Sequence, residues 1–153
     1  MDMLYLSKND PLDFSILATM LSDPADLKLV WPEARHPFDE TEWLASFPGI
    51  DPSASYYVLT GDGPAGHAAL FGTTEPDRLH LAWVYLKPEL RGNGIGQQLL
   101  SLLEVHATDA LRAVALTLKT NTFNPRAYHI YSKAGFYETD QQGDTIFMRK
   151  DFT

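Results

Sequence analysis

The sequence predicts an α+β fold: a mixed, mostly antiparallel sheet of about seven strands flanked by about four helices. Strand-like and helical runs follow one another in the order β-α-α-β-β-β-α-β-α-β-β. Three of the strand-like runs, between residues 55 and 86, are joined by short turns, which is typical of an antiparallel meander. The chain has 153 residues, a length that suits one domain with a real core.

The N-terminal third is expected to hold one strand and two helices. Residues 3–7 read as a strand, and Asp10-Pro11 as a helix start, with Asp as the N-cap and Pro at the first helical position. That helix is expected to end at Ser22-Asp23-Pro24, and residues 25–37 have no clean period.

A second helix is expected to begin at Asp39. Glu42 lies three residues further on, as in a capping box, while Phe38 and Trp43 fit the flanking hydrophobic staple.

The remaining elements follow from alternation, helical spacing and turn residues. The long helix has an apolar face, and the last helix is closed by Gly135 as a left-handed cap. The expected strands are 55–60, 65–72, 78–86, 113–119, 136–139 and 145–149, and the expected helices are 95–111 and 124–134.

The stretch Arg91-Gly92-Asn93-Gly94-Ile95-Gly96 lies between a strand-like run and the long helix. Glycines allow close backbone approach, first-turn N–H groups lack intrahelical partners, and the helix dipole favours an anion. The arginine adds a cation with several donors. The dinucleotide fingerprint fits poorly because its third glycine is misplaced, and the P-loop pattern lacks its Gly-Lys-Ser/Thr.

The pattern Arg-x-x-Gly-x-Gly after a strand ending Leu86-Lys87-Pro88 resembles the acyl-CoA pyrophosphate loop of the GNAT superfamily of N-acetyltransferases. A second stretch, Asn124 to Phe136, is similar to that superfamily's Asn-x-x-Ala-x-x-x-Tyr-x-x-x-Gly-Phe signature. One helix and one strand separate the two, as in the family. The resemblance covers the C-terminal half by motif and the whole chain by element order.

The resemblance implies a single GNAT-like domain over residues 1–153, with an acceptor side at 1–50 and an acyl-CoA-binding core at 78–136. It implies that the strands at 79–86 and 113–119 lie parallel and splay apart, leaving a cleft for the pantetheine of acetyl-CoA, the co-substrate. The residues implied in cofactor binding are Val84, Tyr85, Leu86, Arg91, Gly92, Asn93, Gly94, Ile95, Gly96, Gln97, Asn124, Ala127 and Tyr131.

Acetyl transfer from a thioester to an amine needs a proton donor for the departing thiolate and an acceptor for the amine proton. Tyr131 occupies the family's tyrosine position and is the expected acid, with Tyr128 as the rival phenol. The family's usual glutamate position holds His80, which at a pKa near 6.5 could act as base. His67, Glu75, Asp77 and a water chain remain alternatives.

The acceptor is expected at Trp31 and Trp43, where aromatic and acidic residues would suit an amine. The formal charge of −8 and the absence of a basic stripe argue against nucleic acid. Zero cysteines exclude an acyl-cysteine route and thiolate metal sites, and the histidine spacing predicts no metal.

The sequence therefore predicts a cytoplasmic N-acetyltransferase, without a membrane segment, acting as a monomer or homodimer on a small-molecule amine or a protein amino group by direct attack. A non-catalytic acyl-CoA sensor and a transferase using another acyl-CoA are the alternatives. The identity of the amine stays open.

Overall fold

A computed structural model describes residues 3–152 of the chain. Seven strands form one sheet, and their bounds are β1 Tyr5–Lys8, β2 Ala54–Thr60, β3 Gly63–Gly72, β4 Arg78–Leu86, β5 Ala115–Asn121, β6 Tyr137–Gln142 and β7 Thr145–Asp151. The helices are α1 Ser15–Met20, α2 Pro24–Val30, α3 Glu40–Ser46, α4 Ile95–Asp109 and α5 Pro125–Lys133, with a short 3-10 turn η1 at Pro88–Leu90. None of the helices within residues 3–152 is long and apolar enough to cross a membrane.

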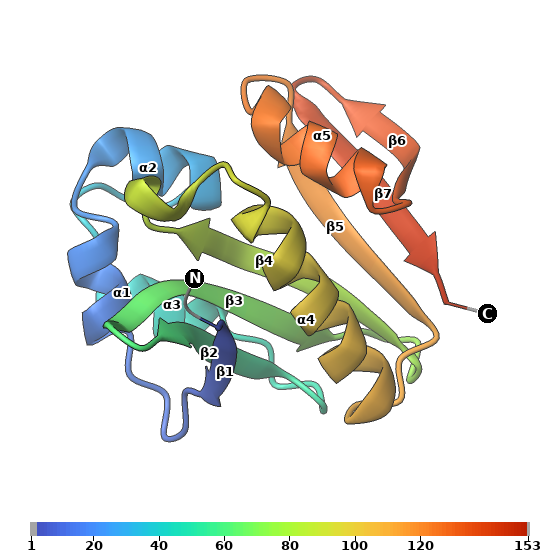
Figure 1. The fold of residues 1–153 in the computed structure, drawn as a ribbon, viewed down its shortest axis with the longest axis horizontal. Coiled ribbons are helices and arrows are strands. Elements are labelled where there is room, and N and C mark those ends of the chain that lie inside the picture. The colour runs from blue at the N-terminus through green and yellow to red at the C-terminus, as the bar shows by residue number, and fades with distance from the viewer. Residues whose placement is uncertain (1–2, 153) are drawn as a thin grey trace.

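The strand order is β1-β2-β3-β4-β5-β7-β6, and β4 with β5 is the parallel pair among antiparallel neighbours. This confirms the predicted mixed, mostly antiparallel sheet. Helices α4 and α5 cover one face (Figure 1), where α4 buries Leu99, Leu100 and Leu103 against the sheet. Helices α1, α2 and α3 bury a separate aromatic-rich cluster against β2, β3 and β4 on the other face.

The structure has one α-helix more than expected, because Ser22-Asp23-Pro24 lies between two helices. Helix α1 ends before this segment, and α2 begins at Pro24. The Asp23 side chain caps α2 by accepting a hydrogen bond from the Ala25 backbone N–H at 2.8 Å. The segment showed no clean period because only Leu27 of this short helix is buried.

The expected helix start at Asp10-Pro11 is wrong: α1 begins at Ser15. Side chains satisfy the intervening backbone amides outside any helix. Asn9 accepts from the Asp13 N–H at 3.0 Å, and Glu40 of α3 accepts from the Phe14 N–H at 2.9 Å. Phe14 is fully buried, so this approach segment serves as a core anchor rather than a first turn.

The expected start of α3 is confirmed in part. Asp39 caps the helix by accepting from the Thr41 N–H at 3.1 Å, and Phe38 stacks on Trp43 with ring centroids 4.8 Å apart. Glu42 does not close the capping box, however, because its carboxylate accepts from the Arg35 backbone N–H at 2.9 Å.

Strands β4 and β5 splay apart, as the family resemblance implies. They pair only from Arg78–Leu81 with Ala115–Leu118, and beyond that point both strands continue without pairing to each other; Figure 1 shows them diverging. The unpaired ends of β4 and β5 leave room for a ligand between the two strands.

A β-bulge in β4 lies where the splay begins. Ala69 pairs with Ala82 and His67 pairs with Tyr85, so two residues of β4, Trp83 and Val84, stand opposite one of β3. Trp83 has φ 55°, a left-handed conformation that is rare for a bulky side chain. The bulge therefore changes the direction of β4 immediately after its last contact with β5.

Candidate active site

The loop before α4 has the geometry of an anion-binding turn. Gly92, Asn93 and Gly94 all have positive φ, at 87°, 53° and 80°, and Gly94 is the N-cap of α4. Among the described residues, nothing accepts a hydrogen bond from the backbone N–H groups of Gly94, Gly96 or Gln97. These donors converge at the positive end of the helix dipole, which is where a phosphate binds.

Gly96 packs against Ile130 of α5. A Cβ atom at position 96 would lie 2.9 Å from Cδ1, the far end of the Ile130 side chain, so that side chain would have to rotate to make room. The side chain of Gln97 also reaches α5, donating to the Ile130 backbone carbonyl at 3.3 Å. These contacts hold the loop before α4 against α5, the helix that carries Tyr131.

Arg91 is held by three contacts beside this loop. Its Nε donates to the Leu86 carbonyl at 3.0 Å, its Nη2 pairs with Asp26 of α2 at 3.4 Å, and its guanidinium lies 5.3 Å from the Tyr85 ring centroid. The Tyr85 hydroxyl donates to the same Asp26 carboxylate at 3.2 Å. Burial, reinforced by the charge of Asp26, raises the pKa of Tyr85 to about 12.

Two hollows of about 330 Å³ each open between β4 and β5. The first lies beside the loop, and its lining includes the predicted cofactor residues Val84, Tyr85, Leu86, Arg91, Gly92, Gly96, Asn124, Ala127 and Tyr131. The second lies toward the N-terminal helices and includes Trp31, Glu33 and His80. We call them the loop hollow and the far hollow. They share Val84, Asn124, Ala127 and Tyr131, so they form one continuous cleft.

Four predicted cofactor residues line neither hollow: Asn93, Gly94, Ile95 and Gln97. Their expected contribution is through backbone N–H groups. Ile95 differs from the others, because its N–H already donates to the Gly92 carbonyl at 3.1 Å and its side chain is buried in the core.

Tyr131 lies on α5 at the point where the two hollows meet. Burial raises its pKa to about 12, so the phenol carries its proton at neutral pH. No hydrogen bond engages its hydroxyl among residues 3–152, and its ring packs edge-on against Phe136 at 5.8 Å. A protonated, uncommitted phenol at this position is able to donate to a ligand atom in the cleft.

The rival phenol, Tyr128, points elsewhere. Its hydroxyl donates to Glu138 of β6 at 2.8 Å on the exposed side of α5, and that bond raises its pKa. It lines neither hollow. The geometry therefore separates two tyrosines that the sequence left in competition.

Asn124 caps α5, accepting from the Ala127 N–H at 3.3 Å. It also lines both hollows, so the capping role and the expected contact with the cofactor arm are compatible.

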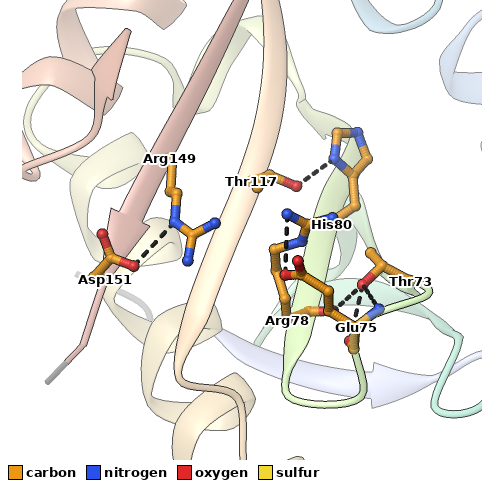
Figure 2. Close-up of polar contacts among 7 residues, drawn as sticks. All are labelled: Thr73, Glu75, Arg78, His80, Thr117, Arg149 and Asp151. Atoms are coloured by element: carbon orange, nitrogen blue, oxygen red, sulfur yellow. Dashed lines mark hydrogen bonds and ion pairs between the residues drawn. The ribbon is translucent and has the colours of Figure 1, made fainter. Parts of the chain in front are cut away.

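His80 lies in the far hollow on the paired part of β4. Its Nδ1 is 2.8 Å from the Thr117 hydroxyl of β5 (Figure 2). Burial, with the charges of Lys119 and Arg78, lowers the pKa of His80 to about 4, so the ring is neutral at pH 7. In the tautomer in which Nδ1 donates to Thr117, Nε2 is left as an acceptor.

The other expected base candidates lie outside the cleft. Glu75 pairs with Arg78 at 3.1 Å in the turn before β4, and neither Glu75 nor Asp77 lines a hollow. His67 is fully buried between the Ser55 hydroxyl at 2.6 Å and the Trp83 carbonyl at 2.8 Å, and burial lowers its pKa to about 4. It holds the main chain of the β4 bulge through the Trp83 carbonyl and does not line the cleft.

The two predicted acceptor residues have different environments. Trp31 lines the far hollow and packs edge-on against Trp43 at 4.9 Å. Trp43 is 0% exposed, lines neither hollow, and packs among Phe38, Trp31 and Trp83. Because a side chain without exposed surface cannot contact a substrate, Trp43 is corrected to a core residue behind Trp31.

Sequence reasoning missed the contribution of α2. Asp26 of this helix fixes Arg91 and Tyr85, and Leu29 and Val30 line both hollows. A seven-residue helix with one buried position gives no periodic signal, so only the Asp23-Pro24 cap could have indicated it. No group of three or more His, Asp or Glu side chains within the described chain is arranged to hold a metal.

A family model described as "Acetyltransferase (GNAT) family" matches residues 19–136. No curated protein matches the chain. Several solved structures are similar. A spermidine N-acetyltransferase of Vibrio cholerae, in complex with CoA and spermine, is 16% identical, with a TM-score of 0.78 over 97% of this chain and 95% of that one.

An N-acetyltransferase of Campylobacter jejuni, in complex with acetyl coenzyme A, is 17% identical, with a TM-score of 0.72 over 99% of this chain and all of that one (100%). A domain from Methanocaldococcus jannaschii is 13% identical, with a TM-score of 0.80 over 99% of both chains. The structural likeness extends over nearly the whole chain, and the family model covers both of its motifs. The chain therefore belongs to the acetyltransferase (GNAT) family.

Proposed function

We propose that this protein transfers the acetyl group of acetyl-CoA to a primary amine by direct attack, with both substrates bound in one cleft. The observation that carries the proposal is the continuity of the two hollows, with a set of free N–H donors at one end and the protonated Tyr131 at their junction. A continuous cleft lets the donor lie in one hollow and the acceptor in the other.

The donor would lie in the loop hollow. Its pyrophosphate fits the free N–H groups of Gly94, Gly96 and Gln97, and its arm fits between α5 and the main chain of Val84, Tyr85 and Leu86. Asn124 and Ala127 border the arm from α5. Both structural neighbours whose complexes are described above contain CoA or acetyl coenzyme A, which supports this class of donor.

The bulge at Trp83 and Val84 would place a backbone group against the thioester carbonyl. A bulged residue lacks a regular ladder partner, so its amide is available to a ligand. An N–H aimed at the carbonyl oxygen stabilises the negative charge that develops there during attack.

Proton movements then follow from the side chains. The amine nitrogen attacks the carbonyl carbon, the C–S bond breaks, and Tyr131 gives its proton to the sulfur. The new amide nitrogen loses a proton, for which we propose Nε2 of His80 as the first acceptor. Because the pKa of His80 is lowered to about 4, it is a weak base, and water is the competing acceptor.

Calorimetric titration with acetyl-CoA, followed by thiol-release assays with an amine panel, tests this function. Tyr131→Phe should lower kcat about 10- to 1000-fold with little change in acetyl-CoA affinity, because only the proton is removed. Tyr128→Phe is the matched control and should leave kcat unchanged, since that hydroxyl contacts Glu138.

Three outcomes would contradict the proposal in different ways. Absence of acetyl-CoA binding would remove the donor assignment. Tight binding without thiol release from any amine would favour a non-catalytic sensor. Preference for another acyl-CoA would keep the enzyme class and change the donor.

A further inference from the structure

We propose that the acceptor is a zwitterion: an amine that also carries an anionic group, a carboxylate or a phosphate, bound by Lys119, Arg78 and Arg149 at the end of the cleft. This inference rests on the proposed function and names the substrate class of the same site. A third hollow, of about 480 Å³ and lined by these three cations together with His80 and Thr117, carries it. We call it the cationic hollow.

The cationic hollow continues the far hollow along one face of the sheet. His80 and Lys119 line both. Alternate residues of a strand share a face, so on β4 Arg78, His80 and Ala82 form a row that runs from one hollow into the other.

The neighbouring strands extend this face. On β5 the row is Thr117, Lys119 and Asn121, and the register places Arg149 of β7 beside Thr117. Figure 2 shows Arg78, His80, Thr117 and Arg149 on these three adjacent strands. The aromatic cluster that packs under α1, α2 and α3 includes none of the described residues of β5, β6 or β7, so this part of the face is not filled by that core.

The charge of the cationic hollow is unusual in a chain of formal charge −8. None of the described residues that line it is acidic. Glu75 pairs with Arg78 at 3.1 Å and Asp151 pairs with Arg149 at 2.9 Å, but each arginine has five N–H donors and retains several. Lys119 is exposed and has no ion pair within the described part of the chain.

Two further observations indicate a positive local potential with unmet donors. The charges of Lys119 and Arg78 both help to lower the pKa of His80. Nε of Arg78 is buried and has no hydrogen-bond partner among residues 3–152. An anion at this end of the cleft would offset the effect of the two cations on the pKa of His80. It would also change the arrangement of the Arg78 side chain, whose Nε has no partner among the described residues.

The far hollow itself suits the amine. Glu33 is the one acidic residue among its described lining residues, and Trp31 lines the same region. A zwitterion lying along the β4 row would therefore have its amine in the far hollow, which Glu33, His80 and Tyr131 line, and its anion in the cationic hollow beyond His80. A polyamine, by contrast, would bring a second cation to Arg78, Lys119 and Arg149.

Matched probes test this difference directly. ε-Aminocaproate and cadaverine carry the same methylene chain and the same primary amine, and differ only in a terminal carboxylate or a second amine. Their dissociation constants are measured by calorimetry on CoA-saturated protein, and their kcat/KM values by thiol release. We expect ε-aminocaproate to bind at least about tenfold more tightly, as charge-assisted contacts imply.

Lys119→Glu should reverse the preference, weakening ε-aminocaproate about tenfold or more and strengthening cadaverine. Lys119 is exposed, so folding should be unaffected, and Arg149→Gln is a second variant whose effect should be smaller because Asp151 already engages that side chain. Lys8→Glu, an exposed lysine on β1 outside the hollows, makes the same change of charge and should leave both constants unchanged.

Several results would overturn the inference. They are equal or tighter binding of cadaverine to the native protein, no measurable binding of ε-aminocaproate, and a Lys119→Glu effect no larger than that of Lys8→Glu. If acetyl-CoA binds and cadaverine is acetylated better, the proposed function stands and only the zwitterion is refuted. If acetyl-CoA does not bind at all, the proposed function itself fails.

Discussion

Two histidines thirteen residues apart in the chain, His67 fully buried and His80 half-buried, both have a pKa lowered to about 4 but differ in their surroundings. His67, between β3 and β4, uses both ring nitrogens, one with the Ser55 hydroxyl and one with the Trp83 carbonyl. His80, between β4 and β5, has one nitrogen bonded to Thr117 and lines the cleft. Burial lowers both pKa values, so the pKa alone does not separate a supporting group from a reacting one. The difference lies in whether a nitrogen is left for a ligand.

The largest expected effect that distinguishes them is on stability. His67→Ala should lower the free energy of unfolding by about 3 kcal/mol, because it opens a cavity and leaves the buried Trp83 carbonyl without its donor. His80→Ala should cost about 1 kcal/mol, since one hydrogen bond is lost at a partly solvated site. Urea unfolding of the two variants measures both values, and equal losses would mean that His67 does not support the bulge.

Acid pH should affect the two histidines in the same way. Each has a folded-state pKa below the unfolded value of about 6.5, so between pH 6.5 and 4 the unfolded chain binds more protons and stability falls as the pH falls. The loss attributable to His67 is on the order of 3 kcal/mol.

His67→Asn retains a donor for Trp83 but cannot titrate, so the pH dependence of unfolding between pH 4 and 6.5 should become shallower. His80→Asn should flatten the same window by no more than that. If the pH dependence is unchanged in both variants, folding does not lower the pKa of either histidine.

The effect on the rate should be the reverse of the effect on stability, because the larger loss of kcat is expected at His80. His80→Asn is expected to lower kcat by about tenfold, less than the usual contribution of a general base, because a pKa of about 4 makes His80 a weak base. The acid limb of kcat that belongs to His80 should lie near pH 4, below the limb set by the amine. Thiol release measured from pH 4 to 9 reports both, and an unaltered profile would assign the proton to water.

The smallest expected effect is that of Thr117→Val, which preserves shape and removes the hydroxyl that holds His80. It should change kcat a few-fold and the free energy of unfolding by less than about 1 kcal/mol. Because Thr117 contacts His80 directly, the double variant with His80→Asn should be no slower than His80→Asn alone. A fully additive loss of rate would indicate that Thr117 acts on the substrate instead.

The C-terminal half of the molecule was predictable because local signals and tertiary structure agree there. Gly94 adopts the left-handed conformation that the turn needs, Asn124 caps α5, and Gly135 has φ 104° at the end of that helix. The splay of β4 from β5 came only from the family resemblance, since it depends on where pairing stops, which no periodicity records.

The N-terminal third was less predictable for a physical reason. Phe14, Leu17 and Trp43 are buried by contacts between short helices, not by a periodic face of one long helix. The same absence of a period gave no indication of Asp26, whose carboxylate contacts Tyr85 and Arg91, 59 and 65 residues later in the chain. The composition of this region suggested an aromatic acceptor site, yet only Trp31 of the two predicted tryptophans lines the cleft.

The close contact at Gly96 has a consequence for the space left to the donor. A side chain at position 96 would turn the end of Ile130 away, and Ile130 is the neighbour of Tyr131 on α5. Gly96 also lines the loop hollow, so each atom added there would occupy volume between the turn that would hold the phosphates and the phenol that would meet the sulfur. The absence of a side chain at position 96 therefore widens the passage in which a thioester arm would lie.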